Sequence, residues 1–205
     1  MFDTERLAID AWEKAGREAG IIFRRQDLNM MKGLSLKNSE IIMKKIMGND
    51  FPFKELSTKK EQYMLNHIEE NGLPVKEGLY GLLDLLDKRN ILKAVATSTM
   101  RKKAEKLLEM ENIYGRFDFK IFGDEVKKGK PDPEIFATVV KKAGCPASEC
   151  LVLEDSENGV VAAVKAGTKA VLIKDEEDIP AYLKNQIYKE FNSLKEFCNY
   201  ISTVL

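Results

Sequence analysis

Three short polar clusters carry residue types that could act together on a phosphoryl group. The segment from Thr97 to Thr99 offers hydroxyl groups, Lys130 offers an ammonium group, and Glu154 and Asp155 offer adjacent carboxylates. Hydroxyl and backbone N–H groups hold phosphate oxygens, an ammonium offsets their charge, and carboxylates ligate a hard cation. Together these groups supply what phosphoryl transfer requires.

Each cluster also has an ordinary structural explanation. Thr-Ser-Thr after a strand usually caps a helix, and the Glu154–Asp155 pair could cap a helix that begins near Ser156. The lysines at 127, 128 and 130 would ordinarily form a solvated charge run. The order of the clusters favours function, because each one follows a predicted strand.

Short runs rich in valine, isoleucine and other apolar residues predict strands over 92–96, 119–122, 151–153 and 170–173. Amphipathic helices are expected over 78–88, 100–111, 133–143, 157–165 and 194–203. This alternation predicts a parallel sheet covered on both faces, and in such sheets ligands bind at the carboxyl ends of the strands. We therefore expect the three clusters to meet at one edge.

The first 71 residues have a different pattern, with apolar residues at helical spacing. Breaks at Gly20, at 33–35 and at 48–52 divide this region into four predicted helices, joined by the short connections that antiparallel helices use. We expect two domains, a small helical bundle over 1–73 and an α/β core over 74–205.

The composition excludes several classes of function. The 205 residues contain 33 Lys plus Arg and 33 Asp plus Glu, so the basic excess of a nucleic-acid binder is absent. Three cysteines without a Cys-x-x-Cys pair fit a reducing cytoplasm, and no apolar segment predicts a signal peptide or membrane span. The sequence predicts a cytoplasmic protein with neither nucleic-acid nor membrane partners.

The clusters resemble three motifs of the haloacid dehalogenase superfamily. Residues 95–99 resemble its second motif, 123–133 its third and 153–159 its fourth, and the likeness spans essentially the whole chain. The chain looks like the helical-cap subgroup that includes β-phosphoglucomutase and phosphoglycolate phosphatase-like enzymes. This resemblance implies an α/β fold, a Rossmann-like three-layer parallel-sheet core with an inserted four-helix-bundle cap domain.

The resemblance also implies roles for individual residues. Thr97 and Ser98 would bind phosphate, Lys130 would bridge phosphate and nucleophile, and Glu154 and Asp155 would hold Mg²⁺. Thr97 and Lys130 are the catalytic candidates. The implied activity is a magnesium-dependent phosphatase acting on a small phosphorylated metabolite, such as a sugar phosphate, through a phosphoaspartate.

The first motif of the superfamily, a strand ending in Asp-x-Asp-Gly, would lie just before Met1. Asp3 aligns downstream of both aspartates, and Asp10 lies within a predicted helix, so the nucleophile has no counterpart in this sequence. The absent strand would lie between those that end at Thr97 and Glu154. Either the start site is placed late and the longer protein is a monomer, or this chain is an inactive domain that binds a phosphorylated ligand or a strand-completing partner.

Substrate choice in this superfamily is attributed to the cap. The residues expected to contact substrate there are Glu5, Gly33, Ser35 and Lys60. For Lys60 the ordinary alternative is an exposed helix cation. Leu36 and Ala8 stand where β-phosphoglucomutase has arginine and histidine, which favours a phosphatase over a mutase. Dehalogenation needs no magnesium, so the fourth motif argues against it. His67 is expected to pack within the cap.

Overall fold

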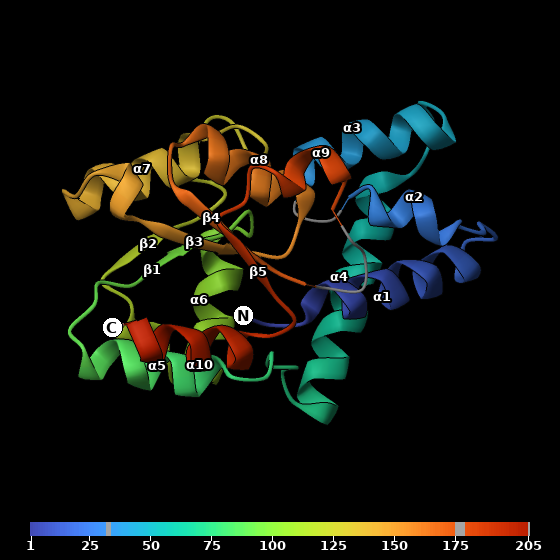
Figure 1. Ribbon diagram of the computed structural model, residues 1–205. Helices are drawn as coiled ribbons and strands as arrows, with labels where there is room; N and C mark the ends of the chain where they lie inside the picture. Colours follow the sequence, from blue (N-terminus) through green and yellow to red (C-terminus); the bar gives the residue numbers. More distant parts are fainter. Residues whose placement is uncertain (32–33, 175–178, 205) are drawn as a thin grey trace. The chain divides into compact units, whose positions relative to one another are not determined.

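The computed structural model describes residues 1–31, 34–174 and 179–204 of the chain. These residues form two compact units, Met1–Val75 and Lys76–Leu205 (Figure 1). Each unit has its own hydrophobic core.

The first unit contains the four expected helices. They are α1 (Thr4–Glu18), α2 (Arg25–Asn29), α3 (Leu36–Met47) and α4 (Phe53–Asn71). Gly20 and Gly48 follow α1 and α3 with φ angles of 73° and 102°, a left-handed conformation that glycine adopts without steric cost. An antiparallel bridge between Phe2 and Val75 joins the two ends of the unit.

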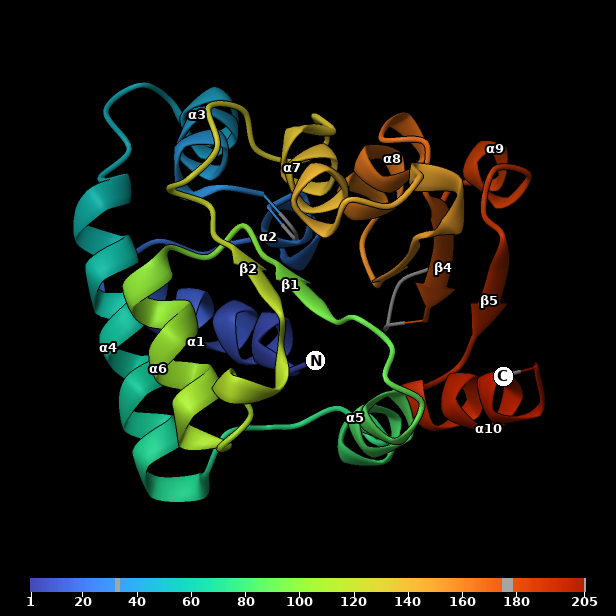
Figure 2. The ribbon, with the colours of Figure 1, turned by 90° about the vertical axis from the view of Figure 1, so that its left-hand side faces the viewer.

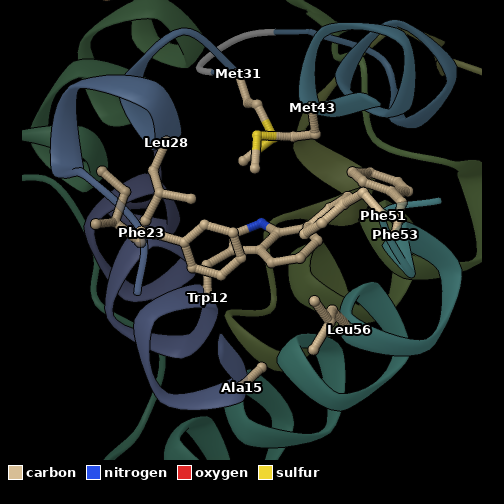
Figure 3. Packing of buried hydrophobic residues seen from close by; sticks show 10 residues of the cluster. Trp12, Ala15, Phe23, Leu28, Met31, Met43, Phe51, Phe53 and Leu56 are labelled. Atoms are coloured by element: carbon tan, nitrogen blue, oxygen red, sulfur yellow. The ribbon is translucent and has the colours of Figure 1, made fainter. Parts of the chain in front are cut away.

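Aromatic side chains fill the core of the first unit (Figure 3). The ring of Trp12 lies 5.4 Å from that of Phe53 and 6.0 Å, edge to face, from that of Phe23. A Cβ atom on Gly16 would lie 2.5 Å from the Phe23 ring, so α1 must carry a glycine where this ring packs. Burial of such rings, together with Met31 and Met43, holds the helices in one bundle.

The second unit alternates strands and helices. Its elements are α5 (Leu79–Lys88), β1 (Ala94–Ala96), α6 (Arg101–Met110), η1 (Tyr114–Arg116), β2 (Phe119–Ile121), α7 (Glu134–Ala143), η2 (Ala147–Glu149), β3 (Leu151–Glu154), α8 (Glu157–Lys165), β4 (Lys169–Ile173), α9 (Ala181–Lys184), β5 (Lys189–Phe191) and α10 (Leu194–Val204). The helices α7 and α8 lie on one side of the strands, with α5 and α10 on the other (Figure 2). The predicted α/β fold class is confirmed.

Two strands differ most from the prediction. The first strand begins at Ala94, because Leu92, expected within it, is 58% exposed and lies before the strand. Strand β5 was not predicted, because two of its three residues, Lys189 and Glu190, are charged and exposed. Only Phe191 turns inward, and there it contacts Phe197 of α10 with ring centroids 5.4 Å apart.

The strands of the second unit belong to two parallel sheets. Strand β1 pairs with β2, and β3, β4 and β5 form the other sheet in that order. Strands β1 and β3 share no hydrogen-bonded ladder, although both carry predicted site residues at their carboxyl ends.

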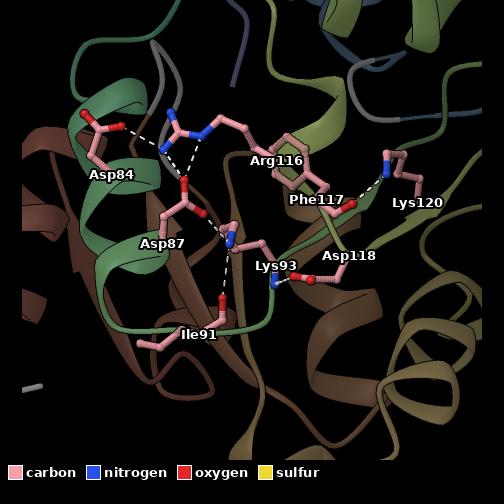
Figure 4. Close-up of polar contacts among 8 residues, drawn as sticks. All are labelled: Asp84, Asp87, Ile91, Lys93, Arg116, Phe117, Asp118 and Lys120. Carbon is pink, nitrogen blue, oxygen red and sulfur yellow. Dashed lines mark hydrogen bonds and ion pairs between the residues drawn. The ribbon is translucent and has the colours of Figure 1, made fainter.

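A polar network at the opposite end of β1 anchors it to α5 (Figure 4). Arg116 of η1 forms ion pairs with Asp84 and Asp87 of α5, and Asp87 also pairs with Lys93 at 2.6 Å. The backbone N–H of Lys93 donates to Asp118, just before β2, at 2.7 Å. Hydrogen bonds from Lys93 and Arg116 lower the pKa of Asp87. The amino ends of β1 and β2 are thereby held together.

Candidate active site

Lys130 connects the ends of two strands from different sheets. Its Nζ atom lies 2.5 Å from Oε1 of Glu154, at the end of β3, and 3.3 Å from the backbone oxygen of Ala96, at the end of β1. The side chains of this ion pair are only 7% and 9% exposed. Because the ammonium reaches both strand ends, the hydroxyl loop after β1 and the acidic pair after β3 belong to one region.

The loop that carries Lys130 is folded by an acidic residue that the sequence analysis did not single out. The carboxylate of Glu134, in the first turn of α7, accepts hydrogen bonds from the backbone N–H groups of Lys127 at 2.8 Å and Lys128 at 2.9 Å. A carboxylate at a helix amino terminus is favoured by the helix dipole. The position of Glu134 directly after Pro-Asp-Pro, where a helix is expected to begin, was the feature of the sequence that could have predicted this role.

The lysine run therefore divides into two kinds of residue. Lys127 and Lys128 are exposed, so the ordinary interpretation of a solvated charge run holds for them. Lys130 is buried and places its ammonium 4.9 Å from the centroid of the Phe136 ring. A buried lysine retains its charge at low cost only when it has a partner, and Glu154 supplies one.

The loop after β1 is fixed by the end of β2. The N–H of Thr97 donates to the backbone oxygen of Ile121 at 3.1 Å, and its Oγ1 accepts a hydrogen bond from the N–H of Thr99 at 3.1 Å. A hydroxyl that accepts one bond can still donate its own hydrogen. Thr97 is therefore able to donate to a phosphate oxygen.

The threonine–serine loop does not cap the following helix, as the ordinary explanation would require. The N–H of Arg101, the first residue of α6, instead donates to Oδ1 of Asp124 at 2.8 Å. The backbone of Ser98 packs against Gly123, where a Cβ atom would lie 2.1 Å from the Ser98 carbonyl oxygen. Gly123 thus allows the loops after β1 and β2 to approach each other closely.

The carboxylate of Glu154 is held from several directions. While Oε1 contacts Lys130, Oε2 accepts hydrogen bonds from the Ser156 hydroxyl at 3.2 Å and from the Asp155 N–H at 3.3 Å. Ser156 is itself the residue that caps α8, accepting from the N–H of Gly159 at 3.1 Å. The acidic pair therefore does not cap the helix.

Asp155 has a basic partner that the sequence analysis did not identify. Oδ2 of Asp155 lies 3.1 Å from Nζ of Lys76, and the two side chains are 31% and 14% exposed. Burial raises the pKa of Asp155, but the nearby Lys76 and Lys130 ammonium groups outweigh it and lower the pKa overall. Lys76 and Asp155 are far apart in the sequence and share no motif. Their ion pair could therefore be found only from the fold.

The donor chemistry of the two carboxylates fits a hard divalent cation. Mg²⁺ is commonly bound by one or two carboxylates, with water and substrate oxygens completing its octahedral shell. Within the described part of the chain, no group of three or more histidine, cysteine or acidic side chains gathers into a metal site. Glu154 and Asp155 would therefore have to share the ion with oxygens from other sources.

The residues predicted to select substrate lie in the first unit. Glu5 is in the first turn of α1, Ser35 caps α3 by accepting from the Asn38 N–H at 3.3 Å, and Gly33 lies outside the described residues. Lys60 is not the exposed cation of the ordinary explanation, since its side chain is 13% exposed. Its ammonium lies 3.2 Å from Glu61 and 5.8 Å from the Trp12 ring centroid.

One expectation for this unit was wrong. His67 does not pack within the helical unit but is exposed on α4, one turn before the end of that helix. Its backbone oxygen accepts a hydrogen bond from the Asn71 side chain at 3.0 Å. The neighbouring Met64 and Ile68 fill the buried positions instead.

Comparison with known proteins identifies the family. The model of the haloacid dehalogenase-like hydrolases matches residues 1–173. The chain belongs to this family. The expectation that it is a hydrolase enzyme is thereby confirmed, and so is the resemblance drawn from the three motifs. No helix among the described residues of this haloacid dehalogenase-like hydrolase is long and apolar enough to cross a membrane.

Several relatives with similar sequences are phosphatases. A phosphorylated carbohydrates phosphatase from Thermotoga maritima is 28% identical over 178 residues, which cover 83% of this chain and 79% of that protein. A pyrophosphatase from Bacillus velezensis is 30% identical over 134 residues, which cover 63% and 62% of the two chains. The haloacid dehalogenase-like chain thus aligns with the relative from Thermotoga over most of both sequences.

Solved structures show the same fold. A hydrolase from Pseudomonas syringae superposes with a TM-score of 0.83 at 23% identity, covering 100% of this chain and 94% of the other. β-Phosphoglucomutase from Clostridium difficile gives a TM-score of 0.79 at 22% identity, with coverage of 99% and 91%. At such identities the likeness establishes the architecture of this haloacid dehalogenase-like hydrolase.

Proposed function

We propose that this protein is a magnesium-dependent phosphatase acting on a small phosphate monoester such as a sugar phosphate. The observation that carries the proposal is the position of Lys130, whose ammonium contacts both the end of β1 and the acidic pair after β3. The sequence likeness to a phosphorylated carbohydrates phosphatase supports the choice of substrate class. A cytoplasmic location and a cap role for the first unit are part of the same proposal.

Each site residue has a task that its chemistry allows. The Thr97 hydroxyl and the Ser98 side chain would donate hydrogen bonds to phosphoryl oxygens, and the Lys130 ammonium would offset their charge. Glu154 and Asp155 would hold Mg²⁺, which when bound supplies further charge neutralisation. Because Glu154 already orients Lys130, the ammonium is positioned before substrate arrives.

The phosphoryl acceptor of the family pattern is an aspartate that has no counterpart in the 205 residues. In the proposed reaction that aspartate would belong to a strand next to β1 and β3. In the described part of the chain, β1 and β3 belong to separate sheets, which supports this placement. The phosphatase proposal therefore applies to a form in which such a strand is present.

The test is phosphate release with Mg²⁺ from a panel of sugar phosphates and other small monoesters. The 205-residue chain is compared with a chain extended by an Asp-x-Asp strand, and only the extended chain should turn over. In the extended chain, Thr97→Val should lower kcat by about tenfold or more, since one hydrogen bond to a charged group is lost. Thr203→Val, at an exposed position of α10, is the matched control and should leave kcat unchanged.

Two alternatives give other outcomes in this test. A mutase would isomerise phosphorylated hexoses with little phosphate release, which chromatography of the sugar products would show. A domain that only binds a phosphorylated ligand or a strand-completing partner would release no phosphate in either form. The separate sheets favour that second alternative, and size-exclusion chromatography would detect association of the 205-residue chain.

A further inference from the structure

Cys145 and Cys150 place their thiols in direct contact. The two Sγ atoms are 3.4 Å apart and share a hydrogen bond, although the residues are five positions apart in the sequence. Both cysteines are partly exposed, and both are free thiols. A disulfide joins its sulfur atoms at about 2.05 Å, so these two atoms need to approach by only roughly 1.4 Å to form one.

The backbone between α7 and β3 brings the two thiols together. Gly144 ends α7 in a left-handed conformation, with a φ of 68°. Within the turn that follows, the N–H of Glu149 donates to the backbone oxygen of Pro146 at 3.0 Å. The N–H of Cys150 donates in the same way to Ala147 at 3.0 Å. These hydrogen bonds fold the connection without any contribution from the sulfur atoms, so the pair is preorganised.

Cys150 is also anchored to the sheet. Its backbone oxygen accepts a hydrogen bond from the N–H of Lys169, the first residue of β4, at 2.9 Å. The next residue, Leu151, begins β3 and pairs with Lys169 in the parallel ladder. Because the sheet holds this end of the connection, a shift on the Cys145 side is enough to bring the sulfur atoms together.

The two thiols are suited to different steps of an oxidation. The Cys150 thiol also donates to the backbone oxygen of Pro146 at 3.6 Å, so its proton has two acceptors close by. Burial, followed by the hydrogen bond with Cys145, raises the pKa of Cys150 to about 11 and keeps this thiol protonated near pH 7. Since the thiolate is the attacking species, Cys145 is the thiol that reacts first with an oxidant.

We propose that Cys145 and Cys150 form a reversible redox site that is oxidised by a low-molecular-weight disulfide. The Cys145 thiolate attacks one sulfur of that disulfide, forms a mixed disulfide and releases the other half as a thiolate. The Cys150 sulfur then loses its proton, attacks Sγ of Cys145 and releases the second half. The two released thiolates take up the two protons, so two protein thiols are oxidised while one small disulfide is reduced to two thiols.

This redox site is independent of the proposed phosphatase activity. Cys150 directly precedes β3, whereas Glu154 ends that strand. The oxidation involves neither the cation nor the phosphate, so its test requires no turnover. Disulfides in reducing compartments are usually transient and redox-sensing, which is the behaviour proposed for this pair. Failure of either proposal would leave the other standing.

The experiment equilibrates the 205-residue chain with reduced and oxidised glutathione, and mass spectrometry after alkylation counts the free thiols. At a fixed concentration of reduced glutathione, half-oxidation of the pair should need at least about tenfold less oxidised glutathione in the folded protein than in urea, because the fold holds the two sulfur atoms in contact. Peptide mapping should show a bond between Cys145 and Cys150 and a free Cys198. Circular dichroism verifies that the oxidised protein is folded.

Serine variants test the assignment of the two thiols. Cys145→Ser and Cys150→Ser should each abolish the intramolecular bond. Cys150→Ser should instead hold a mixed disulfide on Cys145, because the thiol that would displace the glutathione half is gone. Cys198→Ser is the matched control, since it removes a partly exposed cysteine outside the pair and should be oxidised like the unchanged protein.

A bond between Cys145 and Cys150 that forms with the tenfold advantage and is reversed by dithiothreitol supports the inference. A smaller advantage over the chain in urea, or none, would overturn it, because the fold would then not preorganise the pair. A bond to Cys198, or mixed disulfides that persist in the unchanged protein, would overturn it as well. A chain extended by the Asp-x-Asp strand should give the same result and replaces the 205-residue chain if the latter does not fold.

Discussion

The Glu154 carboxylate lies against Gly159, so close that a Cβ atom on the glycine would be 1.9 Å from Oε2 of Glu154. The Glu154 carboxylate occupies the space that a side chain at position 159 would fill in the first turn of α8. Only glycine at this position allows the carboxylate to reach Lys130. The geometry of the candidate site thus depends on a helical glycine that performs no chemistry.

Gly159→Ala should destabilise the second unit by about 1 to 3 kcal/mol, because the added methyl group overlaps the carboxylate and displaces it from Lys130. Gly81→Ala is the matched control, since Gly81 is also helical but a Cβ atom there meets nothing within 4 Å. That control should gain about 0.5 to 1 kcal/mol from reduced chain entropy. Urea denaturation measures both, and equal effects would contradict the proposed contact.

Lys130→Met should cost about 3 to 5 kcal/mol of unfolding free energy, because it leaves the buried Glu154 carboxylate without its partner. Adding Glu154→Gln to the same chain should recover most of the loss, since the unpaired charge is then gone. Chemical denaturation of the single and double variants tests this. A double variant no more stable than Lys130→Met would show that the pair is not coupled.

The lowered pKa of Asp155 predicts a specific dependence of stability on pH. Because its pKa in the folded protein lies below the ordinary value near 3.9, the stabilisation by Asp155 is present above that value and is lost as pH falls through the folded pKa. The difference in urea midpoint between the unchanged protein and Asp155→Asn should therefore shrink as pH falls below about 4. A difference that is constant between pH 6 and pH 2.5 would contradict this.

Burial, followed by a hydrogen bond with Cys145, raises the pKa of the Cys150 thiol to about 11. Since the thiolate is the nucleophile, Cys150 in the folded protein should react with iodoacetamide near pH 7.5 roughly a hundredfold more slowly than in urea. Mass spectrometry of the labelled peptides provides the rate. Equal rates in the folded and unfolded protein would show that the thiol is not protected.

The apolar periodicity was sufficient to predict most of the fold. Helix α8 was predicted with its observed bounds, since it follows an apolar strand and has the apolar pattern of an amphipathic helix. Strand β5 could not be found this way, because its Lys-Glu-Phe sequence has one apolar residue and is stabilised by pairing with β4. A short strand with a single apolar residue gives too little pattern to detect.

The candidate site was predictable only where its residues lie in recognisable motifs. Lys130 and Glu154, 24 positions apart, were both singled out, and the fold brings them into contact. Lys76 and Glu134 were missed, because their roles arise from contacts across the fold that no local pattern encodes. Charged residues are normally solvated, so such supporting residues emerge only from the structure.

The proposed site requires the loops after β1, β2 and β3 to hold one cation and one phosphate together. Its most direct test is the broadening of the ³¹P signal of inorganic phosphate by Mn²⁺ on the protein, because paramagnetic broadening requires both ions to lie close together. Strong broadening is expected with the unchanged protein, and it should be lost in both Thr97→Val and Asp155→Asn. Undiminished broadening in folded samples of both variants would contradict a shared site.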